Sequence, residues 1–316
     1  MAKKLNVSLV FVFITQLFLL PTLAQLKPER VEAPKFEQGQ FGNVFFNDVA
    51  SLLKGERPTT RATARVASVN NSTAETAAAT PVLDADPLAW HKLISPTSLE
   101  DLIKGSKLRL DQTITTPAAF AGGGAVIARK EFSLLALLFA IIEKYPAEVR
   151  WKSSASVARE LMTRVAANTK IGTQQVYAEA KKRLADLGDL TNGSQLTGEA
   201  NPEIDWSQLI DRVPLMQLLD WAQQEHIAPF TANPAEFEKN KEALTRYSEL
   251  VSVLGKSVLI ENMPDAADGD YVAMAQEMIA QSQQIVLAVK TGNAELARQS
   301  AGKVGQSCTK CHDSFR

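Results

Sequence analysis

Large apolar side chains in the C-terminal third of the chain recur at alternating steps of three and four residues, which places them along one face of an α-helix. Turn-forming segments at Pro229–Pro234, Met263–Gly269 and Gly292–Asn293 separate these series. With a further helix ahead of them, they predict an antiparallel four-helix bundle over residues 204–316. The positions that carry the pattern are Phe237, Leu244, Tyr247, Val251, Leu254, Val258, Tyr271, Met274, Met278, Ile285, Val289, Leu296, Val304 and Phe315.

A second helical segment precedes this bundle and has four expected helices with short connections. The first follows Pro96, where Thr97 and Glu100 have the spacing of a capping box. The second ends at Pro146, which is expected to open the third, and Thr173 is expected to cap the fourth. The sequence thus predicts an all-α protein in which a helical domain of unreadable role, residues 89–192, precedes a helical domain at residues 204–316.

The N-terminus has the layout of a secretory signal peptide. Lys3 and Lys4 precede an apolar stretch that ends at the small-residue site Thr22-Leu23-Ala24, so residues 1–24 are expected to be removed on export to the periplasm. The alternative is an uncleaved N-terminal anchor. Residues 25–88 then form an N-terminal segment and a low-complexity linker rich in Thr, Ala, Ser and Pro.

The mature chain is expected to lack an integral membrane span and a nucleic-acid partner. Its most apolar remaining stretch, Phe132–Ile142, is too short to cross a bilayer and is better explained as a buried core helix. Without residues 1–24 the chain keeps 32 basic and 35 acidic residues, a net charge of −3. So nearly balanced a charge does not indicate nucleic acid or an anionic membrane as partner.

The chain contains two cysteines, and both lie in the sequence Cys308-Thr309-Lys310-Cys311-His312. This is the pattern of covalent c-type haem attachment. Residues three and four apart share a helix face, so both thiols and the imidazole would project to one side. Two thioethers would then hold the porphyrin, and His312 would bind its iron. Small residues at Ala301, Gly302, Gly305 and Ser307 would let the ring lie close to the helix.

Three other readings of the cysteine motif are weaker. A redox-active dithiol favours a helix N-terminus after a strand, and no strand is indicated here. A zinc site takes four ligands, and the adjacent Cys311 and His312 are awkward joint ligands. A simple disulfide would leave His312 unexplained.

The C-terminal bundle resembles the cytochrome c-prime family, in which an antiparallel four-helix bundle carries the attachment motif near the end of its last helix. The resemblance covers about residues 204–316 and is carried by the tail Val304-Gly305-Gln306-Ser307-Cys308-Thr309-Lys310-Cys311-His312-Asp313-Ser314-Phe315-Arg316. It implies one haem c, with Arg212 near the haem propionates and Met216 over the open face of the iron. A methionine there is the sixth ligand in six-coordinate, low-spin members.

Two roles are open for Met216: axial ligation, since His/Met pairs bind haem iron, or ordinary core packing. Pro214 departs from the family pattern and is expected to disturb the helix beside the haem. His226 is a second ligand candidate but is better explained as a solvated histidine at a helix end. His91 is expected on the surface.

The function expected from these residues is one-electron transfer by a mono-haem cytochrome, with a redox protein as partner. The alternative is a protein that binds or senses nitric oxide or carbon monoxide at an open or displaceable distal site. We expect no enzymatic activity, because two-haem peroxidases need two attachment motifs and no distal histidine is evident. The resemblance also implies a possible homodimer through the first two helices of the bundle, unless the extra helical domain blocks that contact.

Overall fold

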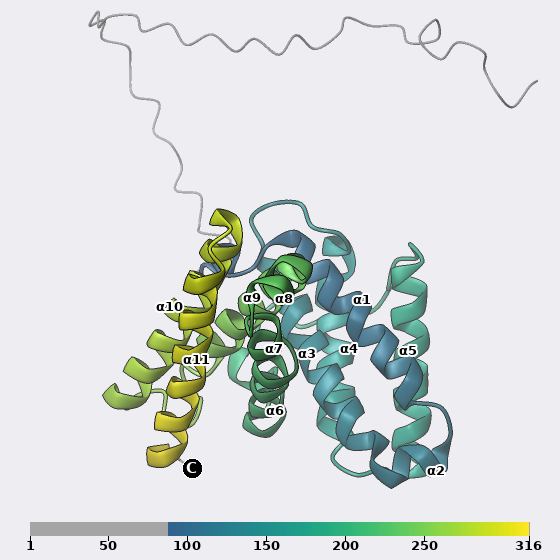
Figure 1. The fold of residues 1–316 in the computed structure, drawn as a ribbon. Coiled ribbons are helices and arrows are strands. Elements are labelled where there is room, and N and C mark those ends of the chain that lie inside the picture. Colours follow the sequence, from purple (N-terminus) through teal and green to yellow (C-terminus); the bar gives the residue numbers. More distant parts are fainter. Residues whose placement is uncertain (1–87, 316) are drawn as a thin grey trace, which may run out of the picture. The chain divides into compact units, whose positions relative to one another are not determined.

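The computed structural model describes residues 88–315, and the expected signal peptide and almost all of the N-terminal segment lie outside this range. Within it the chain is helical and has no strand, which confirms the all-α prediction (Figure 1). The N-terminal block, residues 89–192, contains α1 (Pro96–Thr113), α2 (Pro117–Ala119), α3 (Ala125–Lys144), α4 (Ala155–Asn168) and α5 (Gln174–Thr191). The C-terminal block, residues 204–316, contains α6 (Arg212–Ala222), α7 (Ala228–Phe230), α8 (Pro234–Lys239), α9 (Lys241–Ser257), α10 (Gly269–Thr291) and α11 (Ala294–Phe315).

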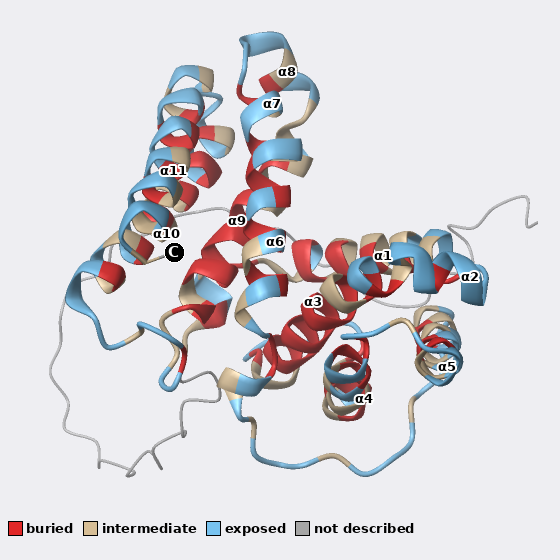
Figure 2. Ribbon diagram, turned by 90° about the horizontal axis from the view of Figure 1, so that it is seen from below, coloured by how far each residue is buried: buried red, intermediate tan, exposed pale blue. Residues whose placement is uncertain are grey.

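Helix α3 is the centre of the N-terminal block. Every residue from Leu134 to Ile142 is fully buried, as the apolar sequence Phe132–Ile142 predicted (Figure 2). A helix that is apolar on all sides needs neighbours all round, and α3 packs against α1, α4 and α6. Each fully buried Leu, Ile or Phe contributes about 1.5–3 kcal/mol relative to an exposed one.

Two helix starts in the N-terminal block differ from the prediction. Ser95, not Thr97, caps α1, because its hydroxyl accepts from the Ser98 backbone N–H at 3.3 Å. The third long helix begins at Ala155 rather than at Pro146. Between α3 and α4 the Lys152 ammonium donates to two backbone carbonyls at the end of α3 and just beyond it, which stabilises an irregular turn there.

Helices α9, α10 and α11 lie where the apolar spacing predicted them. Asp268 caps α10 by accepting from the backbone N–H groups of Asp270 and Tyr271. Gly292 ends α10 with a φ of 68°, in the left-handed region that favours glycine. Helix α10 packs against both α9 and α11, so the bundle is built from sequential neighbours.

The two blocks share one hydrophobic core. Contacts between α3 and α6 and between α1 and α9 cross from one block to the other. Glu249 of α9 accepts from both the backbone N–H and the hydroxyl of Ser95, at 3.1 and 2.9 Å. The division into two domains stays a prediction, and the structure adds that the blocks are in extensive contact. Among residues 88–315 no helix has the length and apolarity to cross a bilayer.

His226 is not the solvated helix-end histidine that the sequence suggested. It lies in a π-helical segment, Gln223–Ile227, which continues α6. Its ring stacks on Tyr247 with centroids 3.6 Å apart and lies perpendicular to the Trp221 ring, with centroids 4.7 Å apart. Burial, and secondly the positive charges of Arg109 and Arg246, lower the pKa of His226 to about 4. The imidazole is therefore neutral at pH 7 and packs among aromatic side chains.

We predict that this histidine makes the fold sensitive to acid. Between pH 6.5 and about 4 the unfolded chain protonates His226 while the folded chain does not, so the free energy of unfolding should fall as pH falls through this range. His226→Phe keeps an aromatic ring beside Tyr247 and should show a shallower loss. Urea unfolding at several pH values measures both proteins, and equal slopes would contradict the prediction.

Candidate haem-binding site

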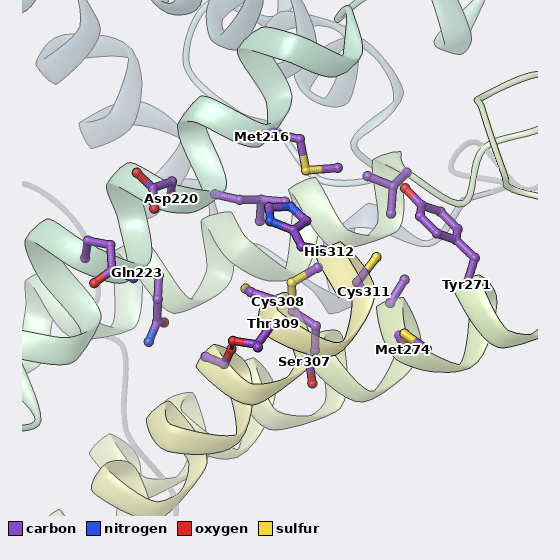
Figure 3. A pocket seen from close by; sticks show the side chains of 16 residues that line it. Met216, Asp220, Gln223, Tyr271, Met274, Ser307, Cys308, Thr309, Cys311 and His312 are labelled. Atoms are coloured by element: carbon purple, nitrogen blue, oxygen red, sulfur yellow. Dashed lines mark hydrogen bonds between the residues drawn. The ribbon is translucent and has the colours of Figure 1, made fainter. Parts of the chain in front are cut away.

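A cavity of about 250 Å³ lies between α6, α10 and α11 in the C-terminal block (Figure 3). It contains the attachment motif and the residue expected opposite it, although they are far apart in sequence. Its lining residues are Met216, Leu219, Asp220, Gln223, Gln224, Val258, Tyr271, Met274, Ala275, Met278, Gly305, Ser307, Cys308, Thr309, Cys311 and His312. The structure thus brings Met216 together with Cys308, Cys311 and His312.

Helix α11 presents the attachment motif on a single face, as its spacing predicted. The helix is regular to Phe315, so Cys308 lies about one turn before Cys311 and His312. All three side chains line the cavity. Val304 and Ala301, one and two turns before Cys308, pack into the core and fix the rotation of the helix. Of the small residues noted in the sequence, Gly305 and Ser307 line the cavity, whereas Gly302 is exposed.

Both cysteines are free thiols and partly buried. Burial raises the pKa of Cys308, and the neighbouring Cys311 and Asp220 add to this rise. Burial also raises the pKa of Cys311, with Arg212 opposing the rise. Cys308 is the more deeply buried of the two. Both sulfurs are therefore held protonated at neutral pH.

The opposite wall of the cavity comes from α6 and from the start of the π-helical segment that continues it. Met216, Leu219, Asp220 and Gln223 recur at steps of three and four residues and so share one face. Met216 is half-buried. Gln223 is buried, and its amide nitrogen donates to the Ala301 carbonyl at 3.3 Å. The sequence analysis did not identify Asp220 and Gln223, although their spacing from Met216 was the available signal.

Two further methionines, Met274 and Met278 of α10, line the same cavity. The sequence analysis identified them as core positions of the bundle. A thioether sulfur is a competent ligand of haem iron, so the cavity offers more than one candidate for the face opposite His312. Any assignment of Met216 must therefore be tested against Met274.

Arg212 and Pro214 both lie in the first turn of α6. The Arg212 guanidinium donates to Asp265 at 2.6 Å and to the Phe315 carbonyl at 3.1 Å, which fastens α6 to the end of α11. It does not line the cavity, and its expected propionate contact stays a prediction. Pro214 does not disturb the helix, because first-turn N–H groups have no intrahelical partner to lose.

The chemistry of this donor set fits haem c. Two protonated thiols one turn apart and an adjacent imidazole face a cavity whose remaining walls are largely apolar. Three thioether sulfurs stand on the other walls. In the described part of the chain no three His, Cys, Asp or Glu side chains gather to hold a bare metal ion.

Comparison with known proteins agrees with this geometry. Residues 266–316 match the family model described as cytochrome C', which covers α10, α11 and the end of the loop before them. The resemblance read from the sequence is confirmed for this segment and remains a prediction for residues 204–265. The C-terminal segment is thus similar to that of cytochrome C', a similarity that suggests a haem c cytochrome. No curated protein and no solved structure matches the chain.

The burial of the two sulfurs predicts a difference in their reactivity. In haem-free protein at pH 7, iodoacetamide should modify Cys311 faster than Cys308, and both more slowly than in urea, because burial raises both pKa values. Peptide mass spectrometry over time measures each site separately. Equal rates at the two cysteines, or rates as fast as in urea, would contradict the described site.

Proposed function

We propose that the protein is an exported, mono-haem c-type cytochrome that transfers single electrons. The observation that carries the proposal is one cavity lined by Cys308, Cys311 and His312 on α11 and by Met216 on α6. Cys308 and Cys311 would hold a porphyrin covalently in this cavity, and His312 and Met216 would be the ligands of its iron. Haem bound in this way supplies a reversible one-electron couple.

Cys308 and Cys311 would attach the cofactor covalently. Each thiol would add across one vinyl group, with the sulfur bonded to one carbon and a hydrogen to the other, so the step needs no oxidant. Both thiols are free and line the cavity, which supports this role. His312 would ligate the iron from the same helix, through neutral imidazole.

Met216 supports electron transfer over ligand binding. It would fill the site opposite His312, so substrates or gases would find no vacant position, and a His/Met pair raises the potential. The cavity wall around it is fixed by Gln223, which is bonded to α11. We further propose that the protein is a carrier rather than an enzyme, that it acts in the periplasm, and that it exchanges electrons with a redox protein.

The alternative proposal is reversible binding of nitric oxide or carbon monoxide. One observation favours it: Met216 is only half-buried, and its unbranched side chain has freedom to move aside. A displaceable methionine would give a site closed in the resting protein and open to a strong ligand. A homodimer through the first helices of the C-terminal block belongs to either proposal, although α6 and α9 already contact the N-terminal block.

We predict that the purified haem protein has a low-spin optical spectrum with a methionine-to-iron band. Carbon monoxide should leave the reduced protein unchanged. Met216→Ala removes the ligand and should give a high-spin spectrum that shifts on gas addition. Met274→Ala is the matched control, because Met274 lines the same cavity from α10 and should not affect the band.

The outcomes separate the proposals. A high-spin wild-type protein that binds carbon monoxide would support gas binding. Loss of the band in Met274→Ala, with no change in Met216→Ala, would assign the ligand to α10 instead. A low-spin spectrum in both single variants would remove both methionines from the account.

A further inference from the structure

Helix α6 has a second face, which points away from the cavity. Trp221 lies five residues after Met216, or about 140° around the helix at about 100° per residue. It is buried, with 9 % of its surface exposed. The side chain that packs α6 against its other neighbours is therefore on the same rigid element as the proposed iron ligand.

Side chains from three helices converge on the Trp221 ring. The Arg109 guanidinium of α1 lies 4.6 Å from its centroid, and the Lys130 ammonium of α3 lies 5.2 Å from it. The Tyr247 ring of α9 lies perpendicular to the indole, with centroids 5.3 Å apart. Cations over an indole face attract it electrostatically, and the contact strengthens when water is excluded. The N-terminal block thus holds the C-terminal end of α6.

Arg109 is itself fixed in place. Its Nε and Nη2 atoms donate to the two oxygens of Glu131, each at 2.9 Å, and Nη2 also reaches the Ser106 hydroxyl at 3.1 Å. Glu131 is fully buried, so its carboxylate depends on this bidentate partner. Because the guanidinium is planar and hydrogen-bonded to Glu131 through two nitrogens, it has one orientation over the indole.

The other end of α6 is held by the same block. Asp211 precedes the first residue of α6, but its carboxylate makes no capping bond to the helix. It pairs instead with Arg129 of α3 and with Lys170 at 3.6 Å. Helix α6 is short and continues into a π-helical segment, so outside contacts set its position.

We propose that the N-terminal block is a two-point brace for α6, with Arg109–Glu131 on Trp221 at one end and Arg129 on Asp211 at the other. The brace fixes the distance of Met216 from the attachment motif. This inference rests on the proposed function for its effect on the haem, and it assigns a role to residues 89–192. Trp221, Arg109 and Asp211 are positioning residues that act through Met216.

Two variants release the brace at different ends. Arg109→Met with Glu131→Met removes the nearer of the two cations from Trp221 and leaves no buried carboxylate without its partner. Asp211→Asn removes the ion pairs at the exposed end of the helix. The matched control is Arg159→Met with Glu143→Met, which removes a similar pair, at 2.9 Å, between α4 and α3 within the N-terminal block.

Hydrogen exchange in the full haem-loaded protein measures the brace directly. Both brace variants should exchange the backbone amides of residues 216–222 at least about tenfold faster than the control, because local opening of α6 becomes easier. The methionine-to-iron band should weaken in the same variants, and carbon monoxide should bind their reduced forms. The proposal is supported if amide exchange becomes faster and the methionine-to-iron band weakens in the brace variants but not in the control.

Equal exchange of residues 216–222 in the brace variants and the control would overturn the brace. The wild-type spectrum tests the proposed function separately, because the exchange comparison does not require Met216 to bind iron. A folded wild-type protein with a high-spin spectrum would therefore contradict electron transfer while the exchange rates still decide whether the N-terminal block holds α6.

Discussion

Helix α6 has to satisfy two neighbours at once, because Met216 and Gln223 face the cavity while Trp221 faces the N-terminal block. A short helix cannot move on one side without moving on the other, so packing against α1 and α3 sets the shape of the cavity. Net stability is a poor explanation for the partly buried Arg109–Glu131 pair, since the desolvation of the charges offsets much of their attraction. A better explanation is that the pair holds the Arg109 guanidinium in a fixed position over the Trp221 ring.

The other wall of the cavity is set by a simpler constraint. On a regular helix, Cys308, Cys311 and His312 can only share a face, and the buried Ala301 and Val304 turn that face toward α6 and α10. The match of residues 266–316 to cytochrome C' covers this wall and not α6. The chain therefore combines a segment similar to cytochrome C' with an opposite cavity wall that is supported by helices outside the match.

Local patterns predicted the elements well and their partners poorly. The spacing of Tyr271, Met274 and Met278 predicted α10, and turn residues marked its ends, because both signals lie within a few residues. Met216 reached the cavity as the resemblance implied. The predicted environment of His226 and the predicted start of α4 were wrong. The stacking on Tyr247 and the Lys152 contacts arise only in the folded protein, so local sequence does not reveal them. The Arg109–Glu131–Trp221 contact joins three helices, and no local spacing encodes it.

The mass of the mature protein, made in a host that matures c-type cytochromes, tests the central claim most directly. The account predicts the mass of the polypeptide plus one haem, which stays bound after acid–acetone extraction and is recovered on the peptide that contains Cys308 and Cys311. A colourless product with the bare polypeptide mass and two alkylatable cysteines would contradict it. In that case the cavity between α6, α10 and α11 would need another occupant.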